Sequence, residues 1–265
     1  MKTYFVDSFT NQKFKGNPAA VCINESDLDN TTMQSIATEI GFSETAFIKK
    51  ISDDTYSIRF YTPKTEIALC GHATLAASKI IFDTTTLENI NFLNCENVEL
   101  KIVKADDKIM MQFPVYETHE IDIPKSILDA IGIDKTITTR FSPKNKIILI
   151  EIEDSATLAN LKPDFPALIN SSSDINGVLV TAQSNNPDFD FHYRYFWPWT
   201  GTNEDPVTGG IQTFLTKYWA TKLNKNKLKS FQSSLRTGMM TTELIQDKLL
   251  IYGEAVTVFE GEFKN

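Results

Sequence analysis

The chain has 265 residues, of which 42% are hydrophobic and 23% are charged, and its formal net charge is -8. These proportions are those of a globular protein with room for one large domain or two small ones, and they exclude a chain that is disordered, collagenous or coiled-coil throughout. An acidic surface repels phosphate backbones, so no nucleic-acid partner is expected. No apolar run approaches the ~18 residues of a membrane-spanning helix, so no membrane partner is expected either.

The cysteine and histidine content argues against disulfides and metals. Cys22, Cys70 and Cys95 are an odd, sparse set with no CxxC pair, so the sequence predicts neither a disulfide framework nor a structural zinc site. The histidines form no HExxH or HxH pattern, so no metal site is expected. The polar segment 1–16 lacks the apolar core of a secretory leader, and a reduced, cytoplasmic location is the expectation.

The first half of the chain alternates strand-like and helix-like segments. Helical spacing of apolar residues predicts a helix over Thr31–Ile40, ended by Gly41, with Asn30, Thr31 or Thr32 as its N-cap. Ala73–Phe82 is apolar or small nearly all round, which predicts a helix buried on most sides. A turn is expected at Gly16-Asn17-Pro18. Strands are predicted by β-branched and aromatic residues over Thr3–Phe9, Ala19–Ile23, Phe42–Ile51, Ser57–Tyr61, Val98–Val103 and Lys108–Phe113.

The second half repeats this character. Pro124–Ile131 is predicted to be a short helix, and the clearest helical stripe in the chain runs from Ile211 to Trp219. The four lysines of Lys222–Lys229 indicate a solvated helix end and turn rather than a binding patch. Strands are expected over Ile147–Ile152, Gly177–Ala182, Asp190–Phe196, Lys248–Tyr252 and Ala255–Phe259.

A short internal repeat suggests a duplicated architecture. Arg59-Phe-Tyr-Thr-Pro63 recurs as Arg194-Tyr-Phe-Trp-Pro198, and each copy is followed by a polar loop, a glycine-containing turn and an apolar helix. A mostly apolar helix needs cover on all sides, which strands curled around it would supply. The sequence therefore predicts two similar α+β lobes with a cleft between them, and a turn of each lobe facing that cleft.

The two glycine turns could bind an anion. The first N–H groups of a helix have no partner within the helix, and glycine lets a ligand approach that backbone closely. Gly71 in one turn and Gly209 and Gly210 in the other could therefore clamp a small carboxylate. The alternative, that these glycines only make tight turns, remains equally open. Neither turn has the spacing of a P-loop or of a dinucleotide-binding motif, so nucleotide binding has no support.

Three polar residues near these turns are candidates for acid–base chemistry. On a strand, Glu44 would share a face with apolar residues, and the lost solvation would raise its pKa towards neutrality, as a general acid/base needs. His72 could carry a proton or donate to an oxyanion. Asp205 could be a second carboxylate that orients a substrate amine or His72. The plainer alternatives are a salt-bridged or edge-exposed Glu44, a capping or packed His72, and a turn-forming Asp205 before proline.

Cys70 also precedes a predicted helix, where a thiol pKa is lowered, so it could serve as a base in a two-base racemase. That chemistry needs a partner on the opposite face of the substrate, and neither Cys22 nor Cys95 lies in the second turn to provide one. A small buried residue is the favoured interpretation of Cys70.

Five segments in this order resemble the phenazine-biosynthesis PhzF-like family, which is related in fold to diaminopimelate epimerase. They are Asp7-Ser-Phe-Thr, Gly16-Asn-Pro-Ala-Ala-Val, Gly41-Phe-Ser-Glu-Thr-Ala-Phe, Leu69-Cys-Gly-His-Ala-Thr-Leu-Ala and Glu204-Asp-Pro-Val-Thr-Gly. The resemblance implies two pseudo-symmetric lobes, each a curved sheet or open barrel around a central helix, with the active site between them. It implies an N-terminal lobe of residues 1–115 plus about 254–265 and a C-terminal lobe of 116–253. It also implies a homodimer that needs no cofactor or metal.

The phenazine enzyme isomerises a dihydro-hydroxyanthranilate by moving a proton. By resemblance, the family's catalytic glutamate, histidine and aspartate correspond to Glu44, His72 and Asp205, with Glu44 abstracting a proton from carbon. The substrate, a small carboxylate-bearing cyclic or amino-acid-like molecule, is expected to be bound by other residues of the matching segments. They are Asn17, Ser43, Gly71, Ala73, Thr208, Gly209 and Gly210.

The chain departs from the family pattern after Gly209. The family usually continues with Ser, Ala and His, whereas Gly210, Ile211 and Gln212 follow here, so a hydroxyl that could contact substrate is missing. Arg236-Thr-Gly238 only loosely follows the usual Gly-Arg-rich segment. The sequence therefore favours a cofactor-independent isomerase without fixing its substrate. The alternatives are a cysteine-type racemase or epimerase using Cys70, and a non-catalytic relative that binds a small molecule or a protein.

Overall fold

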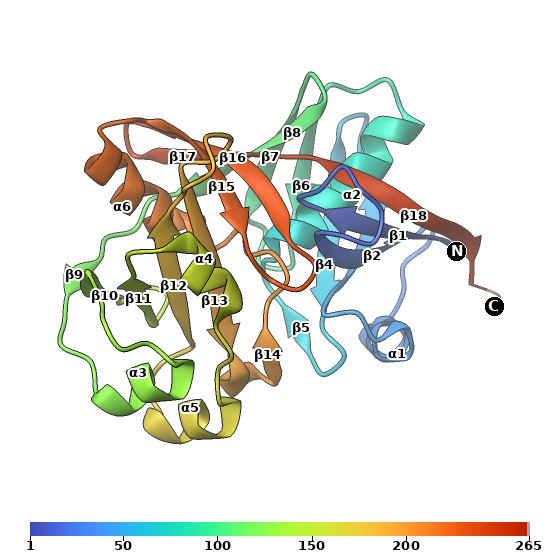
Figure 1. The fold of residues 1–265 in the computed structure, drawn as a ribbon. Coiled ribbons are helices and arrows are strands. Elements are labelled where there is room, and N and C mark those ends of the chain that lie inside the picture. The colour runs from blue at the N-terminus through green and yellow to red at the C-terminus, as the bar shows by residue number, and fades with distance from the viewer. Residues whose placement is uncertain (264–265) are drawn as a thin grey trace. The chain divides into compact units, whose positions relative to one another are not determined.

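The computed structural model describes residues 1–263, which form two compact units (Figure 1). The first unit comprises Met1–Phe113 together with the chain from Leu250 onward, and the second comprises Pro114–Leu249. Both units combine strands with a few helices, so the predicted α+β class is confirmed. Among the described residues, no helix is long and apolar enough to cross a membrane.

The first unit is a mixed sheet with two helices. Strand β1 pairs antiparallel with β2 and β18, β2 runs parallel to β3, and β3 runs antiparallel to β4. The helices are α1 (Asn30–Ile40) and α2 (Gly71–Thr84). The strands are β1 (Lys2–Ser8), β2 (Asn17–Ile23), β3 (Thr45–Lys50), β4 (Thr55–Tyr61), β5 (Glu66–Ile67), β6 (Asn89–Leu93), β7 (Glu99–Ala105), β8 (Lys108–Pro114) and β18 (Ala255–Glu262).

Helix α2 is buried on most sides, as its apolar composition predicts. Ten of its residues, from His72 to Phe82, are buried. Helix α1 instead buries one stripe, in which Met33 and Ala37 pack with Cys22 and Phe47 of the sheet. Gly41 ends α1 in the left-handed conformation, with a φ of 72°.

The second unit is also a mixed sheet with helices on both faces. Its helices are α3 (Lys125–Ile131), α4 (Ser155–Asn160), α5 (Phe165–Ser171) and α6 (Gln212–Leu223), with a 3₁₀ turn at Pro198–Thr200. Its strands are β9 (His119–Glu120), β10 (Thr138–Ser142), β11 (Ile147–Glu151), β12 (Gly177–Gln183), β13 (Phe191–Trp197), β14 (Thr202–Glu204), β15 (Lys227–Gln232) and β16 (Gly238–Ile245). Strand β17 (Lys248–Gly253) begins in this unit, and its residues from Leu250 onward belong to the first unit.

Strand β11 is apolar on both of its faces, and each face packs against helices of the second unit. Successive side chains of a strand point to opposite faces. Ile147 and Leu149 therefore pack with Phe214 and Trp219 of α6, while Ile148 and Ile150 pack in a second cluster with residues of α3, α4 and α5.

The strand pairings of the two units correspond. The order in the first unit is antiparallel β1–β2, parallel β2–β3, antiparallel β3–β4 and parallel β4–β6. The second unit has antiparallel β10–β11, parallel β11–β12, antiparallel β12–β13 and parallel β13–β15. Helix α2 precedes β6 as α6 precedes β15, so the two units have the same order of paired strands and helix.

The repeated Arg-aromatic-aromatic motif has the same role in both units. Arg59 donates from Nε and Nη2 to the two carboxylate oxygens of Glu66, at 2.7 and 2.6 Å. Arg194 donates in the same way to Glu204, at 2.7 and 2.8 Å. Each guanidinium lies over the ring two residues further on, Tyr61 or Phe196. The two copies of the sequence motif therefore make the same arginine–glutamate ion pair and the same arginine–ring contact.

Three local predictions were wrong. Asn17 and Pro18 begin β2 rather than lying in a turn, and the N-cap of α1 is Asp29, whose side chain accepts from the backbone N–H of Thr32. The lysine-rich segment is not only a helix end and turn, because β15 begins at Lys227. Lys227 and Lys229 alternate with buried residues of β15, so they lie on the exposed face of that strand.

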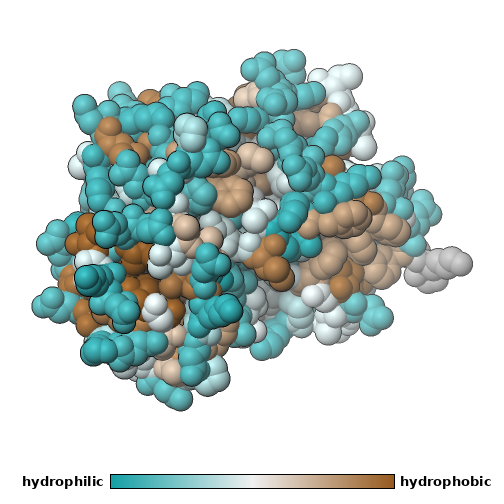
Figure 2. Space-filling model, in the orientation of Figure 1, coloured by the Kyte–Doolittle hydropathy of each residue, from teal (hydrophilic) through white to brown (hydrophobic). Residues whose placement is uncertain are grey.

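An apolar surface accompanies β18. The ring of Phe5 lies 4.9 Å from that of Phe42 and 4.8 Å from that of Phe259, and Phe259 is 48% exposed. Figure 2 shows hydrophobic colouring at the place that β18 occupies in Figure 1.

Candidate functional site

The site in the first unit is built around an ion pair between Glu44 and His72. Glu44 directly precedes β3, and His72 is the second residue of α2. Glu44 Oε2 lies 3.1 Å from His72 Nε2, and the two residues are only 6% and 7% exposed. The parallel pairing of β2 with β3 and the packing of α2 on these strands bring together two residues that are far apart in the sequence.

The other edge of the His72 ring has two polar neighbours. Its Nδ1 lies 3.2 Å from the amide nitrogen of Asn17 and 3.4 Å from the Sγ of Cys70. An imidazolium donates from both ring nitrogens, so in that state the Asn17 amide turns its oxygen to Nδ1. Ser8 Oγ donates to the backbone oxygen of His72 at 2.7 Å. The histidine is therefore held on both ring edges and at its backbone.

The protonation states in this cluster correct one prediction. Burial alone raises the pKa of Glu44, but the charge and hydrogen bond of His72, with smaller effects of Ser43 and Cys70, outweigh it, and the pKa of Glu44 is lowered. The pKa of His72 is raised well above 6.5, because the interactions with Cys70 and Glu44 outweigh its burial. Burial raises the pKa of the Cys70 thiol. These directions favour an ionised Glu44 that faces a protonated His72.

The two helices that follow the glycine turns, like the short helix α3, have no side-chain cap at their N-termini. Asp29, Asp154 and Asp164 cap α1, α4 and α5 with side-chain oxygens. Helices α2 and α6 have no side-chain cap. The first N–H groups of α6 donate instead to backbone oxygens of the preceding turn, so only the start of α2 is considered as a site for an external anion.

The surroundings of two glycines show no steric need for glycine in a tight turn. A Cβ on Gly71 would be in ordinary contact with the ring of Phe113 at 3.7 Å, and one on Gly210 would meet nothing within 4 Å. Neither glycine is among those with positive φ. The fold itself thus does not require glycine at either position.

A second polar cluster lies in the second unit, around Asp205. Thr208 Oγ1 donates to Asp205 Oδ2 at 2.5 Å. Gln232, which is fully buried, donates from Nε2 to the backbone oxygen of Asp205 at 2.5 Å and accepts from the Thr208 N–H at 2.7 Å. Gly209 and Gly210 follow and accept hydrogen bonds from the first residues of α6 through their backbone oxygens.

The structure thus sorts the predicted site residues into two clusters. Glu44, His72 and Asn17 meet in the first unit, Ser43 adjoins Glu44, and Gly71 and Ala73 lie in the first turn of α2. Asp205 and Thr208 meet in the second unit, just before Gly209 and Gly210. Sequence reasoning missed Ser8 and Gln232. Ser8 lies in the quoted Asp7-Ser-Phe-Thr segment, but Gln232 lies at the end of an unpredicted strand and had no signal.

Comparison with known proteins places this geometry in a family. Residues 6–261 match the model of the phenazine biosynthesis-like protein family (PhzC-PhzF). The chain belongs to the PhzF family. An uncharacterized isomerase of Halalkalibacterium halodurans is 39% identical over 264 residues, which cover 98% of this chain and 97% of that protein.

Solved structures of PhzF proteins share the fold. A PhzF family protein of Enterococcus faecalis has a TM-score of 0.93 and 34% identity, covering 100% of this chain and 99% of that one. A predicted epimerase of Pseudomonas aeruginosa has a TM-score of 0.74 at 16% identity, which shows likeness of fold alone. Both the PhzF assignment and the predicted diaminopimelate epimerase-like fold are confirmed. The similarity to proteins named as isomerases supports the prediction that this chain is an isomerase.

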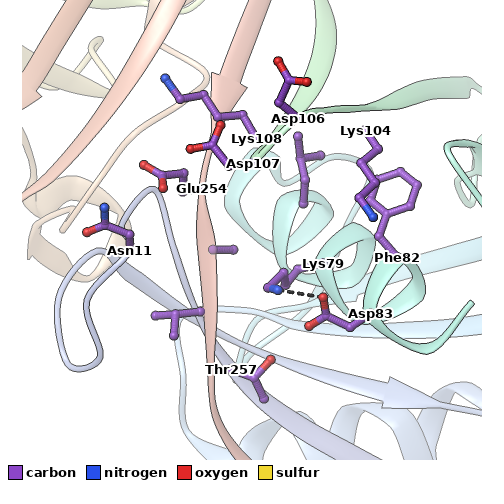
Figure 3. A pocket seen from close by; sticks show the side chains of 13 residues that line it. Asn11, Lys79, Phe82, Asp83, Lys104, Asp106, Asp107, Lys108, Glu254 and Thr257 are labelled. Atoms are coloured by element: carbon purple, nitrogen blue, oxygen red, sulfur yellow. Dashed lines mark hydrogen bonds and ion pairs between the residues drawn. The ribbon is translucent and has the colours of Figure 1, made fainter.

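A cavity of about 440 Å³ in the first unit lies apart from the Glu44–His72 cluster (Figure 3). Its lining includes Lys79, Asp83 and Glu254 but not Glu44, Cys70 or His72. Lys79 points to Asp83 and pairs with it at 2.7 Å, one helical turn along α2. Cations and carboxylates share this open hollow, and we assign it no ligand.

One group of described residues brings three atoms that can bind metals close together. A ligand atom of Glu44, one of Cys70 and one of His72 all lie within 4.8 Å of one another. Sequence spacing gave no sign of this group, because Glu44 joins the Cys-x-His pair only through the fold.

Proposed function

We propose that this PhzF protein moves a proton on a small carboxylate-bearing substrate, with Glu44 as the general base. The observation that carries the proposal is the buried ion pair between Glu44 and His72 beside the uncapped start of α2. A deprotonated carboxylate out of bulk water is a competent base for a carbon-bound proton. The family and its isomerase relatives support the class of reaction.

In the proposed reaction Glu44 takes a proton from a substrate carbon. The electrons of that C–H bond move into the adjacent conjugated system, and a proton is returned at another carbon. Substrate and product therefore have the same atoms and charge. Oε2 of Glu44 faces His72, so we propose that Oε1 is the oxygen that accepts the proton from the substrate.

His72 has two roles in this proposal. Its positive charge keeps Glu44 ionised before the reaction, and it stabilises negative charge that develops on the substrate once the proton has left. The N–H groups at the start of α2 would bind the substrate carboxylate, as anions bind at helix N-termini. Asp205 is proposed as a further participant, and its contribution is tested separately.

The experiment is deuterium exchange in D₂O, followed by NMR, with a panel of small carboxylates that includes the dihydro-hydroxyanthranilate. We expect C–H exchange or isomerisation of at least one compound, and its loss in Glu44→Gln. Glu39→Gln, which removes an exposed carboxylate of α1, is the matched control and should behave as the parent. Exchange that persists in Glu44→Gln would refute Glu44 as the base.

The geometry disfavours Glu44 and Cys70 as the two opposed bases of a cysteine-type racemase. Two bases that flank one carbon on opposite faces, each at a reactive distance of about 3–3.5 Å, are about 6–7 Å apart. The polar atoms of Glu44 and Cys70 lie within 4.8 Å of each other, and the Cys70 thiol is buried with a raised pKa. Thiol alkylation is therefore expected to leave the exchange reaction largely intact on the time scale at which exposed thiols react.

A further inference from the structure

We propose that Asn17 is a positioning residue for His72, and that its amide keeps the ring in place on Glu44 whether or not the imidazole is charged. The effect on His72 itself can be measured without any substrate, whereas the effect on turnover rests on the proposed function. This role differs from the substrate contact that the family resemblance implies for Asn17.

The two ring nitrogens of His72 face different groups. Nε2 lies 3.1 Å from Glu44 Oε2. Cys70 Sγ lies nearer to Nδ1, at 3.4 Å, than to Nε2, at 3.9 Å. A metal ion on the Nε2 lone pair that faces Glu44 would therefore be too far from the sulfur, and the three side chains do not converge on one ion. Nδ1 has a second neighbour instead, the amide nitrogen of Asn17 at 3.2 Å.

Asn17 is the better of the two partners at Nδ1. Its amide can donate from Nδ2 to an unprotonated Nδ1, or turn by half a rotation and accept from an Nδ1–H through Oδ1. A thiol is only a weak donor and a weak acceptor. Asn17 is fully buried and His72 is 7% exposed, so bulk water is a poor substitute for this contact. A charged ring without Asn17 would leave a buried donor poorly paired, which is unfavourable.

The junction of β1 and β2 fixes the Asn17 side chain. Asn17 lies directly opposite Ser8 in the β1–β2 pairing, and Ser8 Oγ donates to the backbone oxygen of His72 at 2.7 Å. Gly16, the preceding residue, has a φ of 66°, and a Cβ on it would lie 2.2 Å from the backbone oxygen of Ser8. The junction thus requires glycine. It lets the chain pass close to Ser8, so that Ser8 holds the His72 backbone and Asn17 holds its ring.

This hydrogen bond matters at one step of the proposed reaction. When Glu44 accepts the substrate proton it loses its charge, and the attraction that holds His72 Nε2 beside it weakens. The contact at Nδ1 does not depend on the charge of Glu44, so it keeps the ring from turning away at that step. The titratable groups that face the ring are Glu44 at Nε2 and Cys70 at Nδ1.

The direct test is an NMR titration of the chain with isotope-labelled histidine, in which the His72 signals are those missing from His72→Gln. Asn17→Leu, which is similar in size, removes the acceptor for Nδ1–H, so His72 should titrate at lower pH than in the parent chain. Asn17→Asp supplies a permanent acceptor and a negative charge, so His72 should titrate at higher pH. A merely disturbed fold would not give opposite shifts from one position. Asn11→Leu, at an exposed amide between the same two strands, should leave His72 unchanged.

An unchanged His72 titration in Asn17→Leu would overturn the proposal, and a shift in Cys70→Ala alone would make the thiol the partner of Nδ1. With an exchange assay in hand, Asn17→Leu should lower kcat about 10²-fold and change KM much less, since misplacing a catalytic group by about 1 Å costs that factor. A raised KM with an unchanged kcat would make Asn17 a substrate contact and overturn its positioning role. A parent chain that exchanges no compound bears on the proposed function alone, and the His72 titration still decides whether Asn17 holds the ring.

Discussion

Glu44 Oε2 and His72 Nε2 lie 3.1 Å apart in a part of the first unit where both side chains are almost fully buried. Burial alone would favour the neutral form of each group, but His72 lowers the pKa of Glu44, and Cys70 and Glu44 together raise the pKa of His72. Replacing one partner therefore changes the acid–base behaviour of the other, and this coupling yields two predictions.

The first concerns the pH dependence of the proposed exchange reaction. His72→Gln removes the interaction that lowers the pKa of Glu44 and leaves the burial that raises it. We expect the acid limb of the pH–rate profile to move to higher pH, and the maximal rate to fall about 10²–10⁴-fold. NMR-detected exchange at a series of pH values measures both.

His119→Gln, at an exposed histidine, is the control and should match the parent profile. An acid limb in His72→Gln that stays in place would show that Glu44 is not the group that titrates in catalysis.

The second prediction concerns stability. The pKa of His72 is raised in the folded chain, so its stabilising contribution is complete below about 6.5 and is lost as the pH rises through the folded value. The pKa of Glu44 is lowered from 4.5, so its contribution is present above that value and is lost as the pH falls through the folded one. Urea unfolding of the parent chain should lose free energy above neutral pH, and His72→Gln should lose less. Identical slopes for the two chains would contradict the raised pKa.

The sequence predicted more of the fold than of the site. Apolar patterning located α1, α2 and α6, because each buries a stripe or a whole circumference of apolar residues, whereas α3 was predicted from Pro124 at its start. It did not locate β15, where exposed lysines alternate with buried residues, or β16, where the buried polar residues Thr241 and Thr242 interrupt the apolar pattern. The short helices α4 and α5 are too brief for a stripe to show.

For the site, motifs identified Glu44 and His72 as residues but not their contact. The sign of the Glu44 pKa shift depends on that contact, so a prediction from burial alone was wrong. Gln232 shows the same limit, since its two hydrogen bonds to the Asp205–Thr208 turn arise only from the tertiary pairing of β13 with β15.

The third prediction compares the two repeated arginine–glutamate pairs. The Arg194 and Glu204 side chains are 10% and 17% exposed, whereas those of Arg59 and Glu66 are 28% and 26% exposed. Removing one partner of a buried pair leaves an uncompensated charge, so Glu204→Gln should lower the free energy of unfolding by about 3 kcal/mol. Glu66→Gln should cost only about 1 kcal/mol, because water screens the remaining arginine. Denaturant unfolding measures both free energies. A larger loss in Glu66→Gln than in Glu204→Gln would contradict the prediction that the more buried pair matters more.

The fourth prediction concerns Asp205, whose backbone and side chain are fixed by different groups. Asp205→Asn keeps an oxygen for the Thr208 hydroxyl but removes the charge, so we expect little change in stability and a fall in exchange rate of about 10²-fold if the carboxylate takes part in proton transfer. Gln232→Met keeps the charge and removes the two hydrogen bonds that Gln232 makes with the turn. Loss of a buried hydrogen-bond partner costs about 1–3 kcal/mol, so this variant should be clearly destabilised. Measuring the exchange rate and the unfolding free energy of both variants separates the effect of the Asp205 charge from the effect of the turn that holds it.

An unchanged rate in Asp205→Asn would remove Asp205 from the proposed reaction and leave Glu44 and His72 as its acid–base groups.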